Sequence, residues 1–544
     1  MTLYQAYSPE ENGSGTSHAN SSDTNSTSTT ERFAGSGTIT RIPDEVLAIV
    51  FFYYAVSLHD SLYTRAWTCT LLRINRHWRE LALHTPILWS FFSSWTLDST
   101  DLGEKQLRLS YAHPLSLKLS PAISSQIDRA FAILEPHKEH VHDVEVNAEA
   151  LMIEYISLRL RQNWKNLRHL SLWSANFRHD MPAHVAQYLI PGLRTLRLIN
   201  VRLDWTFVRH VLHLRLGGSS ELGSITINAL SDVLRSCPTL QTLELFDCVY
   251  RGLHEPNKVH RPAELPQLRR FYIRASVDVC ASVMGLMSLP STAAILIVVN
   301  GTTDAICARP LLVQLSRHLH ARGRSPPKLR SLQFIATCPV KGYAVNCWMR
   351  FMTESCLPFV FNKGAEAIVE TTQLELRLVI PNARGLRRVV TKALNVVRAP
   401  NVEALDVRFS TYMPTGTLRA LLHGLAAVRS IYLTSRTVSV SVFQSVRYLI
   451  EDGNLQGPTC APYKKPLRLP TPQQIFWDTR TLGGADRPVA GDAGREIVKL
   501  LEAYESMGMP IQQVLVSQRP DMSAQIFEEM TMKLGDGFVC PGLT

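Results

Sequence analysis

The sequence has no apolar run long enough to cross a membrane. A bilayer-spanning helix needs about 20 predominantly apolar residues, whereas the densest apolar stretch, AAILIVVN at residues 293–300, has only the length of a strand. The amino terminus, MTLYQAYSPEENG, is polar and acidic, unlike a secretory signal or an Arg-rich transit peptide. We therefore expect an intracellular protein, cytoplasmic or nuclear or both, with no membrane contact.

Cysteine pairs with the spacing of metal ligands are also missing. The ten cysteines are scattered along the chain, and no two form a C-x-x-C pair. Cys338, Cys347 and Cys356 lie nine residues apart, a spacing that matches no zinc site. Free thiols in a reducing compartment are expected.

Motifs for phosphate binding and catalysis are absent as well. The chain contains no G-x-x-x-x-G-K-[ST], G-x-G-x-x-G, G-x-S-x-G or H-E-x-x-H sequence. His137, His140 and His142 could be read as metal ligands, but no cysteine or carboxylate completes the set, so exposed histidines before a strand are favoured. We expect no metal, no cofactor and no catalytic activity in the chain itself.

Charge is sparse, at 19% of residues, but unevenly distributed. The formal net charge is +11, and residues 301–400 hold fifteen Lys or Arg against five Asp or Glu. Three readings stay open: a solvated rim of a repeat domain, a surface for an acidic or phosphorylated protein, and a nucleic-acid surface, which the scarcity of interleaved aromatics disfavours. The candidate residues for an acidic target are Arg322, Arg324, Lys328, Arg330, Arg384, Arg387 and Arg388.

The composition changes along the chain and suggests four parts. Residues 1–38 form a leader rich in Ser, Thr, Asn and Gly, which cannot bury enough apolar area to offset its chain entropy and is expected to be disordered. A helical module is predicted over residues 39–95 and a repeat domain over 96–517. The repeat domain includes a Pro/Gly-rich loop at 457–492, and residues 518–544 are expected to form a tail that caps the domain or frays.

The module opens on RIPDEVLAIVFFYYAV, residues 41–56, which is dense in apolar side chains. Ile42, Val46, Val50 and Tyr53 recur at helical spacing, and Leu47 and Phe51 widen the same face. Such a helix is either an ordinary cap on the repeat domain or a docking surface for another protein.

A second helical block follows in LLRINRHWRELALHTPILW, where Leu71, Ile74, Trp78 and Leu81 are spaced three and four residues apart until Pro86 stops the pattern. Together the two blocks carry a family resemblance. Ile-Pro-x-Glu-Val-Leu from residue 42 resembles the opening Leu-Pro-x-Glu-Ile-Leu of the F-box, and Ile-Asn-Arg-His-Trp from residue 74 resembles its Val-Cys-Arg-x-Trp half. The arrangement is especially similar to F-box proteins of mushroom-forming fungi.

The resemblance implies a small all-α module that binds a Skp-family adaptor and, through it, a cullin ubiquitin ligase. It covers about residues 40–92, and the order and separation of the two halves make it more specific than either half alone. By position, the residues expected to contact the adaptor or complete its interface are Ile42, Pro43, Val46, Leu47, Val50, Phe51, Leu72, Ile74 and Trp78.

Beyond Trp95 the pattern changes to short strand-like units of the form L-x-x-L-x-L, whose alternate residues enter a core. Examples are NLRHLSLWSANF, GLRTLRLINVRL, TLQTLELFDCVY and NVEALDVRFS, with amphipathic helices between them. Their irregular separation indicates a degenerate α/β leucine-rich-repeat-like solenoid with insertions.

The F-box resemblance, together with the repeats that follow it, implies a substrate-recognition subunit of an adaptor–cullin–F-box (SCF-type) ubiquitin ligase. The module would hold the adaptor and the repeats would hold an unknown target, so that the target is placed near the reactive ubiquitin without chemistry by this chain. The alternatives are a ligase-independent repeat scaffold and, less favoured, a nucleic-acid-binding protein that uses the 301–400 region.

Overall fold

A computed structural model provides the three-dimensional structure of the chain. It describes residues 42–540 except 58–60, 122, 161–163, 176–178, 191, 219–224, 253–260, 321–328, 338–343, 354–371, 381–382, 398–400, 410–414, 426, 434–441, 448–471, 478–490 and 517–523. The predicted leader, residues 1–38, lies outside the described residues. Within them, no helix is both long and apolar enough to span a bilayer.

The described residues from 42 to 89 contain helices and no strands, and we refer to them as the helical module. Its elements are α1 (Asp44–Ser57), α2 (Ser61–Thr64), α3 (Thr68–Ile74), α4 (Arg76–Leu83) and α5 (Pro86–Trp89). A small core of buried side chains holds them together. Two tryptophans anchor this core: the Trp67 and Trp89 rings meet edge to face at 5.2 Å, and Trp89 Nε1 donates to the carbonyl of Ala82 at 2.8 Å.

The second helical block is divided at Asn75, where a single helix was predicted across Ile74 and Trp78. Asn75 is extended, with φ −158° and ψ 175°, so it ends α3. Its side-chain carbonyl then accepts the backbone N–H of Trp78 at 2.7 Å and caps α4. An asparagine at this position therefore starts a new helix, because its oxygen satisfies an N–H group that has no intrahelical partner.

The rest of the chain forms an α/β domain with one large, mostly parallel sheet, compatible with a solenoid-like repeat. The strands of this sheet are β1 (Phe91–Ser93), β2 (Leu115–Leu119), β3 (Val141–Ala148), β4 (His169–Ser174), β6 (Thr195–Ile199), β8 (His213–Gly217), β10 (Thr242–Phe246), β13 (Arg270–Ala275), β15 (Ala294–Thr302), β16 (Ser331–Thr337), β17 (Val345–Met352), β18 (Thr372–Ile380), β19 (Ala404–Phe409), β20 (Ser430–Leu433), β21 (Gln474–Trp477), β22 (Gln513–Val516) and β23 (Phe538–Val539).

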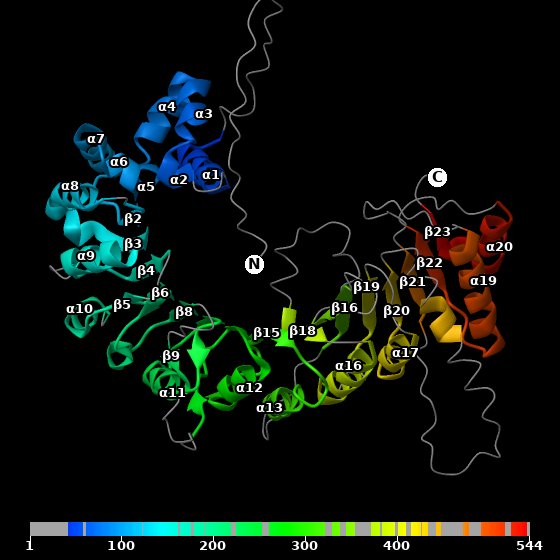
Figure 1. The fold of residues 1–544 in the computed structure, drawn as a ribbon. Helices are drawn as coiled ribbons and strands as arrows, with labels where there is room; N and C mark the ends of the chain where they lie inside the picture. Colours follow the sequence, from blue (N-terminus) through cyan, green and yellow to red (C-terminus); the bar gives the residue numbers. More distant parts are fainter. Residues whose placement is uncertain are drawn as a thin grey trace, which may run out of the picture.

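Helices cover one side of this sheet. They include α7 (Thr100–Ser110), α8 (Ser124–Leu134), α9 (Ala150–Leu160), α10 (Ala183–Leu189), α11 (Ile227–Ser236), α12 (Val277–Gly285), α13 (Arg309–Leu319), α16 (Ala383–Val397), α17 (Thr415–His423), α19 (Gly491–Ser506) and α20 (Ala524–Leu534). Figure 1 shows an arc with the strands on its inner side and the helices outside. Alternate strand residues face the helices, as in β10, where Leu243 and Leu245 are fully buried while Glu244 points the other way.

The helical module is fixed to the first strand of the arc. Gln106 on α7 is 1% exposed, and its Nε2 donates to the carbonyls of Trp89 at 3.0 Å and Phe91 at 2.7 Å. The Tyr63 ring of α2 meets the Phe91 ring edge to face at 5.5 Å. One buried side chain thus joins the last helix of the module to the first strand of the large sheet.

The order of strands is inverted in the middle of the arc. From β1 to β15 each strand pairs in parallel with the next large-sheet strand along the chain. The next neighbour of β15 is β18, which pairs with it in parallel. On its other side β18 pairs antiparallel with β17, and β17 pairs antiparallel with β16. β16 then pairs in parallel with β19, and the regular order continues to β23. A three-stranded meander is therefore inserted in reverse.

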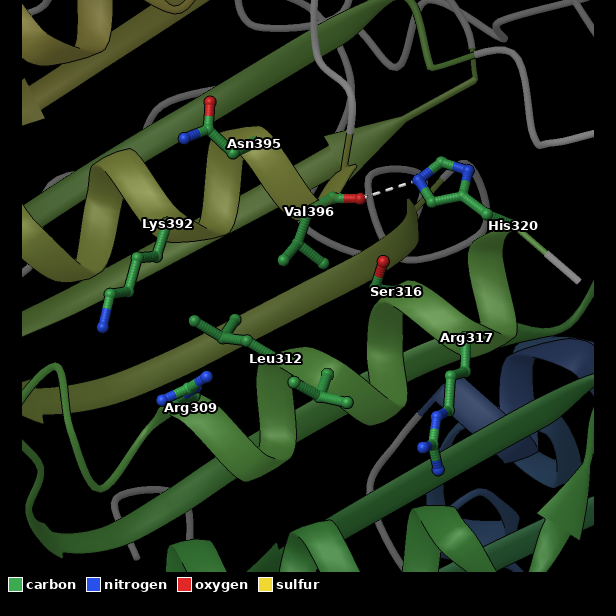
Figure 2. A pocket seen from close by; sticks show the side chains of 9 residues that line it. Arg309, Leu312, Ser316, Arg317, His320, Lys392, Asn395 and Val396 are labelled. Carbon is green, nitrogen blue, oxygen red and sulfur yellow. Dashed lines mark hydrogen bonds between the residues drawn. The ribbon is translucent and has the colours of Figure 1, made fainter.

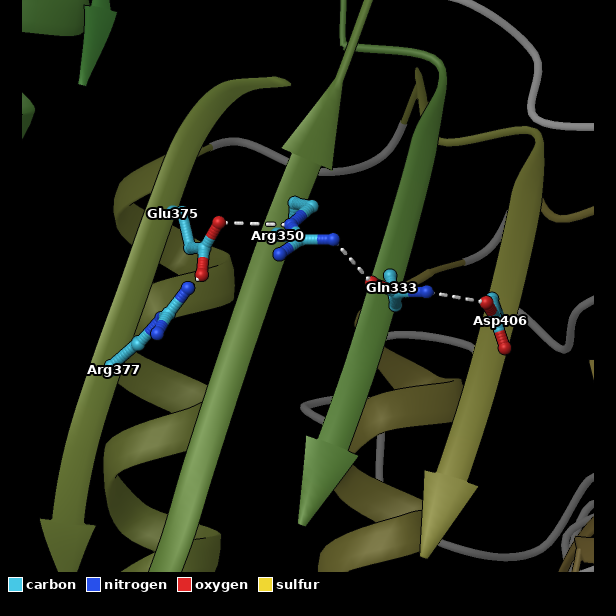
Figure 3. Close-up of polar contacts among 5 residues, drawn as sticks. All are labelled: Gln333, Arg350, Glu375, Arg377 and Asp406. Atoms are coloured by element: carbon cyan, nitrogen blue, oxygen red, sulfur yellow. Dashed lines mark hydrogen bonds and ion pairs between the residues drawn. The ribbon is translucent and has the colours of Figure 1, made fainter. Parts of the chain in front are cut away.

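A row of polar side chains crosses this meander on the face away from the helices (Figure 3). Arg350 donates to Glu375 and Gln333, each at 2.9 Å, and the Gln333 amide donates to Asp406 at 2.7 Å. Arg377 and Arg408 pair with the two carboxylates at the ends of the row. Glu375 and Asp406 are only 6% and 3% exposed as side chains.

This row favours one strand register. The partners come from β18, β17, β16 and β19 in spatial order, and a slip of one residue would turn each side chain toward the opposite face. A slipped register would leave buried carboxylates without their partners, which costs several kcal/mol.

The structure adds strands that the sequence pattern missed and moves two predicted boundaries. β8 and β17 were not among the predicted strands, and β21 lies within the predicted loop at 457–492, whose other described residues are few. The predicted tail from residue 518 contains α20 and β23, and β23 pairs with β22. The sheet therefore starts before residue 96 and continues past residue 517.

Replacing Gln333 with leucine tests the role of the polar row. The change leaves one N–H group of Arg350 without its acceptor and removes one hydrogen bond to Asp406, which still accepts from Arg408. We therefore expect the free energy of unfolding to fall by about 1–3 kcal/mol. Urea denaturation followed by circular dichroism measures this, with Gln314→Leu on α13 as the matched control. Equal stability of the two variants would contradict a register-setting role.

Candidate functional site

Helix α1 is apolar on all sides, and only one side is covered. Leu47, Phe51 and Ala55 are 3%, 0% and 0% exposed and belong to the core of the helical module. The Phe51 ring lies 4.9 Å from the ring of Trp78. This corrects the prediction for Leu47 and Phe51, because both side chains contact this chain's own residues and present no surface to an adaptor.

The opposite side of α1 is open to solvent. Val46, Val50 and Tyr53 are 46%, 49% and 67% exposed, and Ile49 and Val56, which were not predicted, are 56% and 47% exposed. These five side chains form what we call the α1 face. An amphipathic surface helix normally carries polar residues on its solvent side, and a contiguous apolar patch on a protein surface marks a contact site for a partner.

The charges of α1 are confined to its start. Asp44 and Glu45 lie in the first turn, where the helix dipole favours negative charge. His77 of α4 lies 3.0 Å from Asp44 and ties the two helices together at this end. From Val46 onward the helix has no charged residue, so the α1 face offers burial of apolar area without desolvation of an ion.

The remaining predicted adaptor residues lie around this helix. Ile42 and Pro43 are exposed before α1, and the Pro43 carbonyl accepts the first helical N–H groups. Ile74 is 50% exposed at the end of α3. Leu72 and Trp78 are half-buried and pack against the module core, so they support the fold as well as bordering the surface.

The predicted basic residues are placed only in part. Arg330 is exposed before β16, and Arg387 and Arg388 are exposed on α16. Arg322, Arg324 and Lys328 lie outside the described residues, as does the side chain of Arg384.

The structure also brings in basic residues that the sequence reasoning missed. Arg309 and Arg317 on α13 share a groove with Lys392 on α16, and Lys392 also borders Arg387 and Arg388. α13 and α16 are distant in sequence but adjacent in space because β15 pairs with β18. The sequence did contain a signal for this basic surface, because neither helix has an Asp or Glu.

Metal-binding groups do not assemble in the part of the chain that the structure describes. No three His, Cys, Asp or Glu side chains there are grouped as metal ligands, and the rings of His137 and His140 are 6.5 Å apart. Burial raises the pKa of Cys248 and of Cys280 to about 12, so both thiols stay protonated and unreactive at neutral pH.

No protein-family model and no curated protein matches the chain. Among solved structures it is similar to a chain of the yeast Rad7 and Elc1 complex, with 14% identity and a TM-score of 0.31 over 72% of this chain and 88% of that one. At this level of similarity, neither fold nor function passes from one protein to the other.

The two sides of α1 predict opposite outcomes for the same substitution. Leu47→Asp places a carboxylate in the module core and is expected to cost about 3–5 kcal/mol of stability. Val50→Asp, on the α1 face, is expected to stay within about 1 kcal/mol of the parent protein. Limited proteolysis of the helical module measures the difference, and equal protease sensitivity of the two variants would contradict the assignment of the two sides.

Proposed function

We propose that this protein is the substrate-recognition subunit of an adaptor–cullin–F-box ubiquitin ligase. In this function the helical module binds a Skp-family adaptor, which joins the chain to a cullin ligase, and a leucine-rich-repeat-like solenoid binds a target protein. The chain contributes no catalytic group.

The observation that carries this proposal is the open α1 face within the sequence that resembles an F-box. Burying one Val, Leu, Ile or Phe side chain contributes about 1.5–3 kcal/mol. The five side chains of the α1 face are between 46% and 67% exposed. Covering them with a partner can therefore contribute several kcal/mol to the binding free energy. A module of about 50 residues has only a small core of its own, and apolar side chains left exposed do not add to that core. A partner that covers these side chains would explain why the α1 face is apolar.

The proposed mechanism is placement of the target. Gln106 and Phe91 hold the helical module against the first strand, so a bound adaptor would keep a fixed orientation to the sheet. A target held by the solenoid then stays at a defined distance from the ligase partner that carries ubiquitin. Holding the two reactants together raises their effective concentration, which is the whole catalytic contribution of such a receptor.

An adaptor-binding experiment tests the proposal on the α1 face alone. Full-length protein with Val46→Asp plus Val50→Asp is expected to lose co-purification with a Skp-family adaptor, because two charges would have to be buried in the interface. Leu151→Asp plus Met532→Asp is the matched control, since these side chains are 73% and 80% exposed elsewhere in the chain.

The outcomes separate the candidate functions. Loss of the adaptor in the α1 variant and retention in the control supports the ligase function. Adaptor binding that survives in the α1 variant would refute the interface. A parent protein that binds no Skp-family adaptor but still captures a protein target would be a scaffold that acts without the ligase.

A further inference from the structure

The outer surface of the solenoid has a groove between α13 and α16 (Figure 2). Its volume is about 660 Å³. The two helices are closed against each other at one end, where His320 at the end of α13 makes a 2.8 Å hydrogen bond with the Val396 carbonyl of α16. The groove lies on the helix side, away from the polar row on the inner face of the sheet.

The residues that line the groove lie along one side of each helix. On α13 they recur at intervals of three and four residues, which is the spacing of one helix face. Leu312, Val313 and Val396 supply an apolar floor, and Ser316 and Asn395 add neutral polar groups. Val313 is 41% exposed, so the floor is open to a ligand.

The rims of the groove are cationic. Arg309 and Lys392 extend from the two helices at the same end of the groove (Figure 2), and Arg387 and Arg388 continue the positive surface along α16. Arg317 adds a further cation along α13. Neither α13, α16 nor the neighbouring α17 contains an aspartate or glutamate.

Asp304 lies near Lys392 at this cationic end, and its carboxylate already accepts hydrogen bonds from the backbone. Its Oδ1 accepts the backbone N–H groups of Ile306 at 2.8 Å and Cys307 at 2.7 Å. Lys392 Nζ donates to the Ala305 carbonyl at 3.0 Å, which leaves two of its three N–H bonds for another acceptor. Within the described residues, no salt bridge engages Arg309, Arg317, Arg387, Arg388 or Lys392.

We propose that this groove binds an acidic peptide segment, with an apolar side chain of the peptide on the Leu312–Val313–Val396 floor and its carboxylates on the cationic rims. The eleven residues of α13 measure about 16 Å, which matches about five residues of extended peptide. Arginine and lysine in this position form charge-assisted hydrogen bonds with carboxylates.

A peptide fits the groove better than a nucleic acid does. No Phe, Tyr or Trp side chain lines the groove to offer a base a stacking surface, and the His320 ring is engaged by the Val396 carbonyl. The cations also gather around a short apolar floor, whereas a nucleic acid would need phosphate contacts along a longer path.

This inference deepens the proposed function, because it names the chemistry of a target segment and where it binds. It depends on that function only for the statement that the occupant is a ligase target. The groove and the α1 face share no residue, so peptide binding is measured on the full-length protein without an adaptor, and either claim can fail alone.

The experiment uses a fluorescein-labelled nine-residue peptide with leucine at its centre and aspartate at the other positions. Fluorescence polarisation at low salt is expected to show saturable binding. Replacing each aspartate of the peptide with asparagine is expected to weaken binding at least about tenfold. The loss of a single charge-assisted hydrogen bond already weakens binding by about that factor. Arg309→Ala plus Lys392→Ala in the protein is expected to weaken it by a similar factor, and Val313→Asp is expected to weaken it as well.

The matched control is Arg269→Ala plus Arg270→Ala, two exposed arginines at the start of β13 on another part of the sheet. This control is expected to bind the peptide like the parent protein. The proposal is overturned by an absence of binding up to millimolar protein, by equal binding of the asparagine peptide, or by equal loss in the control. A twelve-nucleotide single-stranded RNA that binds more tightly, and that depends on Arg309 and Lys392, would assign the groove to nucleic acid instead.

Discussion

The structure depends on one constraint: every strand of the ladder must place alternate side chains under a covering helix. Where this holds, as at Leu243 and Leu245 of β10, the intervening side chains, such as Glu244 and Phe246, lie on the inner face of the arc. The helical module continues this arrangement at the end of the arc. There Gln106 of α7 donates hydrogen bonds to Trp89 of α5 and to Phe91 of β1, and so joins the module to the sheet. Helix α1 is the exception, because no described residue covers the apolar side of the helix that carries Val46, Val50 and Tyr53.

The inverted meander extends this constraint to the outer surface. It inserts β17 and β16 between β18 and β19, and the polar row from Glu375 to Asp406 favours that order on the inner face. On the outer face the same rearrangement sets α13 beside α16, two helices without acidic residues. A change in strand order thus creates both a buried ion network on one side of the sheet and an uncompensated basic groove on the other.

Local patterns in the sequence were enough to predict many strands of the large sheet. The L-x-x-L-x-L spacing located strands such as β4, β6, β10 and β19, because alternation reports burial directly. β21 was missed since four residues between Pro/Gly-rich stretches give almost no pattern. The sides of α1 could not be told apart, because Leu47 and Val50 are both apolar and only packing separates them. The pairing of α13 with α16 depends on strand order, which no local pattern encodes.

The central claim is that the uncovered side of α1 is a protein-binding surface. Hydrogen–deuterium exchange of the full-length protein, measured with and without a purified Skp-family adaptor, tests it most directly. We predict that added protection appears in residues 44–57 and in the adjoining α3–α4 turn, while the strands of the arc keep their exchange rates. Unchanged exchange throughout α1 at saturating adaptor, or new protection confined to the solenoid, would contradict the account.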